Sequence, residues 1–197
     1  MNITEDHWID EAKRELIPGG SAMNTRRFLV QHFTAGASAL SSIGFWRSPA
    51  AAGASAHIVI DRDGTIYQCR PFNRTCGHAG KSSWTDPNTG KVYNNLNTCS
   101  IGIEIANGGD SYPTRFSKLS PTKARHKNGG PVREWETYTE AQIKAVKEVS
   151  KLIVERYNID DLVGHDDIAP TRKTDPGPAF PMLEVREYCG FEGLPKR

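Results

Sequence analysis

Ser100-Ile-Gly-Ile-Glu-Ile-Ala106 is the stretch around which the rest of this chain can be organised, because it is strongly apolar and one acid interrupts it. Its isoleucines are β-branched, and such residues favour strands. In an alternating strand Glu104 faces away from Ile103 and Ile105, toward either solvent or a cleft. Burying a lone carboxylate is costly unless it is paired or coordinated. The segment therefore predicts a core strand that carries a candidate functional acid.

Strands and helices alternate on both sides of this segment. Arg27–His32 is an apolar strand that ends in a histidine, and Ala56–Ile60 with Thr65–Cys69 forms a hairpin signal around an Asp-Gly turn. Thr139–Tyr157 is the clearest helix, because it combines a Thr-x-x-Gln capping box with apolar residues at helical spacing. The alternation predicts one α/β domain, 1–197, with a central mixed sheet flanked by helices. Shorter elements are expected as helices at 4–16, 37–46 and 183–188 and a strand at 162–163.

Composition describes a globular protein and argues against several classes of function. The chain has 197 residues, of which 37% are hydrophobic and 24% charged, enough for one domain with a substantial core. A net charge of +2 gives no support for nucleic-acid binding. No stretch approaches the roughly 20 apolar residues of a membrane span, and the acid-containing N-terminus does not resemble a signal peptide. We therefore expect synthesis in the cytoplasm, with any export by a route that needs no cleavable signal.

The four cysteines contain no C-x-x-C pair, which argues against a structural zinc-thiolate site. Cys69 and Cys76 could pair in an oxidising compartment. The sequence leaves their redox state open.

The loop 163–177 concentrates polar chemistry in a short, proline-punctuated segment that contains His165, Lys173 and Asp175. Prolines and glycines fix such a backbone, so the segment resembles a binding or catalytic loop. Imidazole and carboxylate are ligands of catalytic zinc, and a lysine is a natural partner for a developing oxyanion. The alternative is that these side chains are simply solvated. His32, at the end of its strand, could equally be a hydrogen-bonded core histidine.

The segment 107–136 shows no clear secondary structure in the sequence, and it holds proline, glycine and many basic residues. Long loops in compact domains are often functional or mobile. Two interpretations stay open, a flexible rim over the active site and a plain solvated insertion.

Five sequence blocks, taken in order, resemble the zinc-dependent N-acetylmuramoyl-L-alanine amidases of the peptidoglycan-recognition and phage-lysozyme type, the amidase type 2 family. The blocks are Leu29–Ala35, Ser55–Gln68, Gly77–Gly80, Asn97–Glu104 and Gly164–Phe180. Together they span about 27–182, nearly the whole of one domain. The resemblance implies the mixed α/β fold of that family.

The resemblance also assigns roles to particular residues. It implies His32, His165 and Asp175 as ligands of one catalytic zinc ion, with a fourth position open. Glu104 matches the general base, and Lys173 matches the residue that polarises the scissile carbonyl. The implied reaction hydrolyses the amide between the lactyl group of N-acetylmuramic acid and L-alanine.

Further positions are expected to contact substrate or to support the fold. His78 lies in the block that resembles the substrate groove, so a contact with the sugar or the lactyl group is expected. Arg172 could bind a stem-peptide carboxylate or form a surface salt bridge, and His57 is interpreted as a buried structural histidine. The sequence departs from the family pattern at Gly77, where a tryptophan is usual, and this affects substrate specificity more than chemistry.

Three interpretations of the biological setting compete. The preferred one is a monomeric, wall-degrading endolysin that reaches peptidoglycan after holin-type or other non-classical release. The second is a cytoplasmic enzyme that recycles anhydro-muropeptides, and the third a peptidoglycan-binding module without activity. A zinc hydrolase of other amides is expected only if the resemblance misleads. The completeness of the candidate site favours an enzyme.

Overall fold

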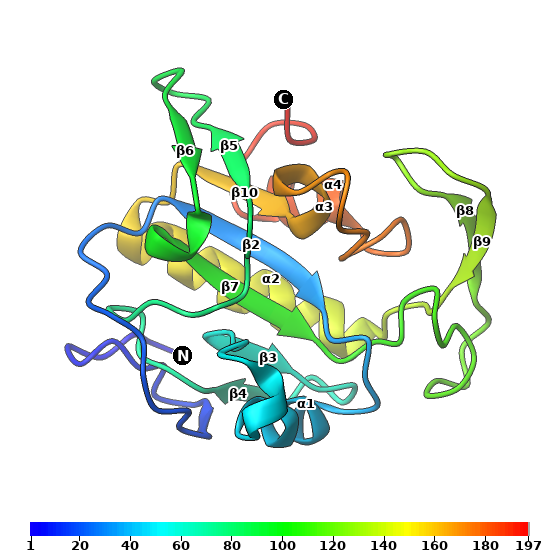
Figure 1. Ribbon diagram of the computed structural model, residues 1–197, viewed down its shortest axis with the longest axis horizontal. Coiled ribbons are helices and arrows are strands. Elements are labelled where there is room, and N and C mark those ends of the chain that lie inside the picture. Colours follow the sequence, from blue (N-terminus) through cyan, green and yellow to red (C-terminus); the bar gives the residue numbers. More distant parts are fainter. Residues whose placement is uncertain (197) are drawn as a thin grey trace.

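The structure is a computed structural model that describes residues 1–196. Its centre is a six-stranded mixed sheet (Figure 1), in which β3 and β4 are antiparallel and the other neighbouring strands are parallel. The strands, in spatial order, are β1 (Lys13–Arg14), β4 (Ile66–Gln68), β3 (Ile58–Ile60), β7 (Ser100–Ile105), β2 (Phe28–Phe33) and β10 (Asp161–Gly164). The predicted mixed α/β fold is confirmed, and the segment 100–106 supplies a central strand.

Alternation along the central strands separates the core from the candidate site. Leu29 and Ile103 face the helix α2 (Glu140–Tyr157), where they join Val149 in the main hydrophobic cluster. His32 and Glu104 are out of phase with these residues by an odd number of positions, so their side chains lie on the opposite face. The sheet thus places its two polar strand-end residues away from α2.

Three of the four expected helices form close to their expected positions, as α1, α2 and α4. α2 has the predicted capping box, since Thr139 accepts from the Gln142 amide and the Gln142 side chain accepts from the Thr139 amide. The remaining helical segments are α1 (Ala39–Trp46), α3 (His165–Ile168), α4 (Met182–Tyr188) and short 3₁₀ turns at Pro49–Ala51 and Leu96–Thr98. Within residues 1–196 no helix combines the length and the apolar character that crossing a membrane requires.

The predicted helix at 4–16 is wrong. His7 has a positive φ of 66°, which a right-handed helix does not permit. The Thr4 hydroxyl instead bonds to the backbone of Trp8, and Ile3 pairs with Ile9 in an isolated bridge. Burial of the neighbours Trp8 and Ile9, rather than of residues four apart, fixes this turn.

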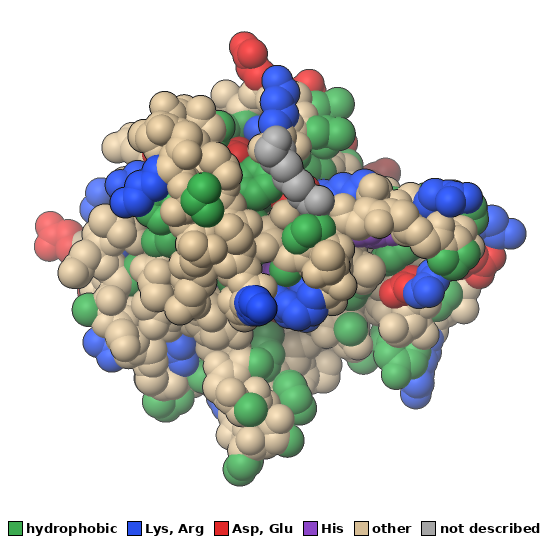
Figure 2. Space-filling model, turned by 45° about the horizontal axis from the view of Figure 1, so that its top comes forward, with side chains coloured by type: hydrophobic (Ala, Val, Ile, Leu, Met, Phe, Trp, Pro, Cys, Tyr) green, Lys and Arg blue, Asp and Glu red, His purple; other side chains and the backbone are tan. Residues whose placement is uncertain are grey.

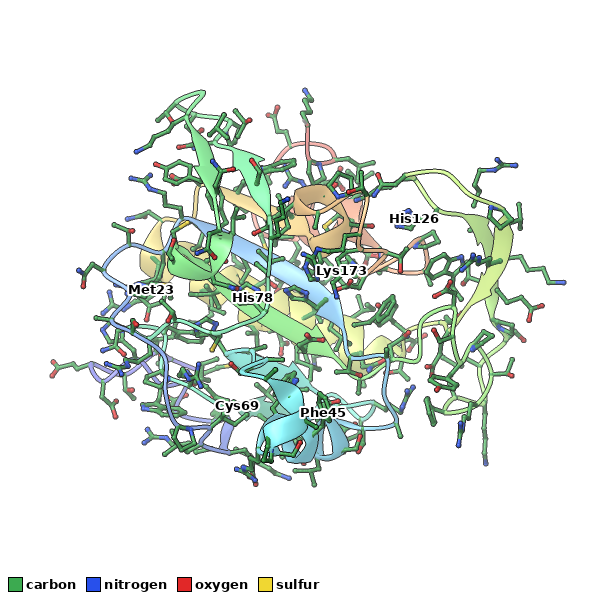
Figure 3. All side chains as sticks on the ribbon, in the orientation of Figure 1. Met23, Phe45, Cys69, His78, His126 and Lys173 are labelled. Atoms are coloured by element: carbon green, nitrogen blue, oxygen red, sulfur yellow. The ribbon has the colours of Figure 1, made fainter. Side chains whose placement is uncertain are left out.

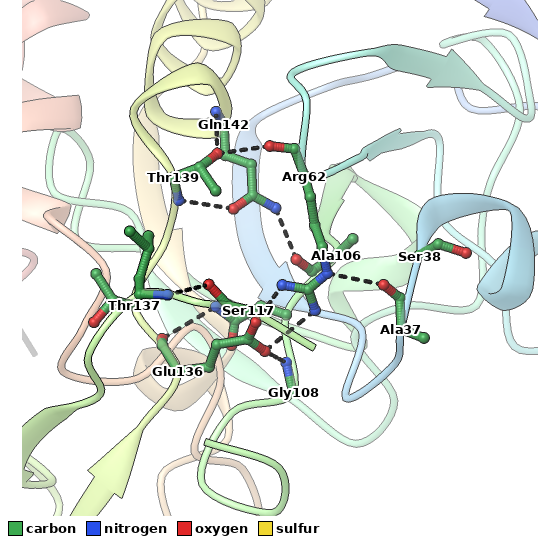
Figure 4. Close-up of polar contacts among 12 residues, drawn as sticks. Ala37, Ser38, Arg62, Ala106, Gly108, Ser117, Glu136, Thr137, Thr139 and Gln142 are labelled. Carbon is green, nitrogen blue, oxygen red and sulfur yellow. Dashed lines mark hydrogen bonds and ion pairs between the residues drawn. The ribbon is translucent and has the colours of Figure 1, made fainter. Parts of the chain in front are cut away.

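The segment 107–136 contains a two-stranded hairpin, β8 (Thr122–Arg125) with β9 (Val132–Trp135), and is not the irregular loop that was expected. Figure 4 shows how its two ends are held together: the Glu136 carboxylate accepts from the Gly108 amide and pairs with Arg62. Figure 1 shows the hairpin at the edge of the molecule, beyond α3 and α4.

A second hairpin, β5 (Ser83–Thr85) with β6 (Val92–Asn94), was not expected from the sequence. It is fixed by the buried Trp84, whose indole donates to Asp161 at 3.0 Å. Figure 2 shows lysine and arginine dispersed over the visible face, with acids between them and no single basic patch.

Candidate active site

Three side chains whose nitrogen or oxygen atoms could bind a metal ion converge at the carboxyl ends of the parallel strands. These potential metal ligands are called the donors below. His32 is the next-to-last residue of β2, His165 begins α3 directly after β10, and Asp175 follows ten residues later. His32 Nδ1 lies 2.9 Å from His165 Nδ1 and 3.0 Å from Asp175 Oδ2. The third separation, from His165 Nδ1 to the same carboxylate oxygen, is 2.9 Å. All three side chains are buried, and their donor atoms are close enough for one ion to contact them all.

The hydrogen bonds around His165 test whether a cation fits between these donors. Its Nε2 lies 3.1 Å from the carbonyl oxygen of Ala79, which can only accept, and 3.4 Å from Arg172 Nη2, which can only donate. The shorter contact favours Nε2 as the nitrogen that carries the proton of a neutral ring. Nδ1 is then a bare lone pair that faces the Asp175 carboxylate. Two acceptors at this distance repel each other unless a cation lies between them. Two imidazoles and one carboxylate therefore fit a divalent metal, and they form the ligand chemistry of catalytic zinc.

The ionisation of the donors agrees with this fit. Burial, together with the nearby His165, lowers the pKa of His32 to about 4. Burial alone would raise the pKa of Asp175, but its contacts with His165 and His32 outweigh burial and hold this pKa well below its ordinary range. Near neutral pH, His32 is uncharged and Asp175 is ionised, which are the states in which both side chains bind metals.

Glu104 lies beside the donors with an unsatisfied oxygen. Its Oε2 is buried and has no hydrogen-bond partner among residues 1–196. Burial raises the pKa of this carboxyl well above its ordinary value, the Asp175 charge adds to the rise, and Lys173 opposes it. A carboxyl with a raised pKa suits proton transfer near neutral pH.

His165, Asp175 and Glu104 line a cavity of about 330 Å³, which Lys173 and Arg172 also line. Figure 3 shows Lys173 and His78 in front of the sheet, on the side opposite α2. In the described part of the chain, the Lys173 ammonium forms no ion pair or hydrogen bond. It is therefore free to contact a bound molecule.

Arg172 forms no surface salt bridge within residues 1–196, so that alternative finds no support. Its Nη2 donates to the carbonyls of Ala79 at 2.9 Å and Lys81 at 3.0 Å. The guanidinium thus bridges the ligand loop and the segment 79–81. A contact between Arg172 and a stem-peptide carboxylate stays a prediction.

His78 lines the same cavity and contacts His32, whereas His57 does not line it. His78 is buried with its Nδ1 3.0 Å from His32 Nε2, and burial holds its pKa well below the ordinary value. His57 accepts from the Gly102 amide at 3.1 Å and contacts the Arg74 carbonyl at 2.8 Å, as a structural histidine would.

Sequence reasoning missed the contacts that hold the ligand loop from outside. Lys127, at the tip of the β8–β9 hairpin, lies 2.7 Å from Asp167 and 2.9 Å from Asp166, and His126 contacts Asp166 at 3.0 Å. Tyr138 Oη donates to the Pro176 carbonyl at 2.8 Å. The only sequence signal for the hairpin contact was a basic run and an acidic pair, 40 residues apart.

The fold and the side chains define an α/β domain in which His32, His165 and Asp175 form a buried group that could hold a metal ion, beside a cavity. The chain belongs to the N-acetylmuramoyl-L-alanine amidase family, whose model matches residues 22–178. This match confirms the family that the five blocks indicated. The site roles inferred from the resemblance stay proposals, as do the boundaries of the domain and the monomeric state.

Curated and solved relatives agree with the family. The 1,6-anhydro-N-acetylmuramyl-L-alanine amidase AmpD of Enterobacter cloacae is 35% identical over 128 residues, which cover 64% of this chain and 52% of the relative. The chain thus spans about half the length of the curated relatives that it matches first.

Two solved structures show the same fold. A selenomethionine derivative of AmpD has a TM-score of 0.67 and 29% identity, covering 93% of this chain and 97% of that one. The amidase AmiD from E. coli, in complex with anhydro-N-acetylmuramic acid-L-Ala-D-gamma-Glu-L-Lys, has a TM-score of 0.66 and 28% identity. Those matched residues cover 91% of this chain and 63% of AmiD.

Proposed function

We propose that this protein is a zinc-dependent amidase that hydrolyses the bond between the lactyl group of N-acetylmuramic acid and L-alanine in anhydro-muropeptides. The observation that carries the proposal is the triangle of His32, His165 and Asp175 donors, with mutual separations of 2.9 to 3.0 Å, beside the unsatisfied Glu104 oxygen. A metal site that keeps a position open toward a cavity is the arrangement of catalytic zinc.

The residues of this chain divide the chemistry between them. Zinc bound by the three donors supplies Lewis acidity, which makes water nucleophilic near neutral pH and polarises a carbonyl. Glu104 takes the proton of the attacking water and delivers it to the departing alanine nitrogen, with the raised pKa that both transfers need. The Lys173 ammonium, which has no ion pair or hydrogen bond within residues 1–196, stabilises the oxyanion that forms on the carbonyl oxygen.

The relatives support a small anhydro-sugar substrate better than polymeric wall. Several curated relatives are named 1,6-anhydro-N-acetylmuramyl-L-alanine amidases, and the AmiD structure holds an anhydro-muropeptide. The recycling activity, expected from the sequence as an alternative, is therefore preferred to the endolysin. Release through a holin-type pore finds no support in these relatives. Binding without cleavage is disfavoured because all five metal and acid-base positions are filled.

Product analysis tests the proposal. Zinc-loaded and chelator-stripped protein would each be incubated with a purified anhydro-muropeptide and, separately, with intact sacculi. We expect mass spectrometry to detect free anhydro-N-acetylmuramic acid and a peptide that begins with L-alanine, only with metal and at a higher rate from the soluble substrate. Faster release of peptides from sacculi would restore the endolysin. Intact substrate in both reactions would contradict the proposal.

A further inference from the structure

The outer nitrogens of both metal-site histidines contact one short segment, His78-Ala79. His32 Nε2 lies 3.0 Å from His78 Nδ1, and His165 Nε2 lies 3.1 Å from the Ala79 carbonyl oxygen. The backbone amides of His78 and Ala79 both donate to Asn97 Oδ1, at 3.1 and 2.7 Å. One asparagine therefore fixes the segment that contacts both rings.

His32, His78 and Ser100 form a chain of contacts, and the proton positions in it follow from the acceptor atoms of Ser100. The Ser100 hydroxyl donates to the Leu96 carbonyl at 2.6 Å, so toward His78 Nε2, 3.2 Å away, it can only accept. The Ser100 carbonyl, 3.4 Å from the same nitrogen, is also an acceptor. His78 Nε2 therefore carries a proton, and in the neutral ring Nδ1 is an acceptor.

The same reasoning then shows which ring nitrogen of His32 carries the proton. An accepting His78 Nδ1 requires His32 Nε2 to donate, which leaves His32 Nδ1 as a bare lone pair directed at the donor triangle. The ring of His78 has little freedom to turn away, because a Cβ added at Gly102 would lie 2.5 Å from its Cγ. The absence of a side chain at 102 leaves the space that this ring fills.

We propose that His78 is a positioning residue, which fixes the tautomer and the orientation of His32 so that Nδ1 faces the metal. This inference rests on the proposed function, because it assumes that the donor triangle holds zinc. Both ring nitrogens of His78 have protein partners, so the substrate contact expected from the sequence stays a prediction that is separate from this role. Hydrogen bonds to the far nitrogen of a metal-bound histidine orient the ring and raise its basicity.

Two variants of the same position separate this role from simple packing. His78→Asn keeps an acceptor where Nδ1 lies, whereas His78→Leu fills the space without one. Competition with a chromophoric chelator should show zinc affinity reduced about 10- to 100-fold for His78→Leu and restored to within a few-fold by His78→Asn. His57→Gln is the matched control, because His57 is also buried beside Gly102 but forms no hydrogen bond with His32, His165 or Asp175 among residues 1–196. The zinc affinity of this variant should equal that of the wild type.

A measurement on the unaltered protein protects the test from misfolding of a variant. Long-range ¹H–¹⁵N spectra of the zinc-loaded wild type should show the proton of His32 on Nε2 and that of His78 also on Nε2. A folded His78→Leu protein with wild-type zinc affinity, or an Nδ1 proton on His32, would overturn the inference. If the wild type binds zinc with these tautomers but cleaves no muropeptide, the proposed function fails and the role of His78 stands.

Discussion

Glu104 lies directly opposite His32 in the parallel register of β7 and β2. Neighbouring strands are about 4.8 Å apart, so this pairing holds the candidate base beside a candidate ligand by core backbone hydrogen bonds alone. We expect Glu104→Gln to retain zinc and the fold while kcat falls about 100- to 10,000-fold. Steady-state rates and metal content would be measured together. A zinc-replete variant with wild-type kcat would remove Glu104 from the mechanism.

The same carboxyl makes the stability of the metal-free protein depend on pH. Burial, and then the Asp175 charge, raise the pKa of Glu104 well above its ordinary 4.5 in the folded state. The folded state holds this proton more tightly than the unfolded chain, so the stabilisation is complete below about pH 4.5 and is lost as pH rises through the folded pKa.

Glu104→Gln removes that ionisation. We expect the free energy of unfolding of the metal-free variant to be about 0.5–2 kcal/mol larger than that of the wild type near pH 8. This difference should shrink toward pH 4.5. Thermal melts in chelator across this pH range would measure the difference. A constant difference at every pH would show that ionisation is not its cause.

Local patterns predicted the sheet and helix α2 because both carry their signals within a few residues. The isoleucines at 101, 103 and 105 and the capping box at Thr139 are examples. The turn at 4–16 was missed because helical spacing there was incidental and the positive φ of His7 has no apolar signature. The backbone conformation of 4–16 is determined by its contacts with the rest of the fold and not by a local sequence pattern.

Some residues of the candidate site were also predictable from the sequence, and others were not. The three donors and Glu104 belong to blocks that resemble a family, so each was identified from the sequence. Asn97 and Lys127 were missed because their partners, the 78–79 amides and the 166–167 carboxylates, lie about 20 and 40 residues away. Such contacts depend on the packing of loops, which no local periodicity encodes.

Metal should contribute directly to stability, because it binds His32, His165 and Asp175 together only in the folded state. Zinc at about 1,000 times its Kd is expected to stabilise the folded state by about 4 kcal/mol. Chelation should therefore lower the Tm of the wild type. An Asp175→Asn variant, which lacks one anionic donor, should respond much less to both zinc and chelator. Identical melting with and without zinc would contradict a metal at this site.

Lys173 is expected to act on the transition state, since it lines the cavity and its ammonium has no hydrogen bond or ion pair with residues 1–196. Lys173→Met should reduce kcat about 100- to 1000-fold, with a small change in KM. Lys81→Met is the control, because Lys81 is an exposed neighbour that does not line this cavity. If Lys173→Met changes only KM, the lysine binds substrate and does not stabilise the oxyanion.

Arg172 is expected to contribute to substrate binding through the free part of its guanidinium. Arg172→Lys loses the planar pair of donors that recognises a carboxylate, so KM should rise several-fold for a muropeptide with a full stem peptide. A substrate that ends at L-alanine amide lacks those distal carboxylates and is the control. An equal rise for both substrates would mean that Arg172 only holds the segment 79–81 in place.

The hairpin tip should restrain the loop that supplies His165, because Lys127 contacts the buried carboxylates of Asp166 and Asp167. Lys127→Met leaves both acids with fewer partners, and we expect faster amide hydrogen exchange in 122–135 and in 164–168. Lys123→Met on the same hairpin removes only an exposed pair with Glu134, which contributes at most about 1 kcal/mol, so exchange should change little. Faster exchange confined to the hairpin would show that the tip rests on the ligand loop without restraining it.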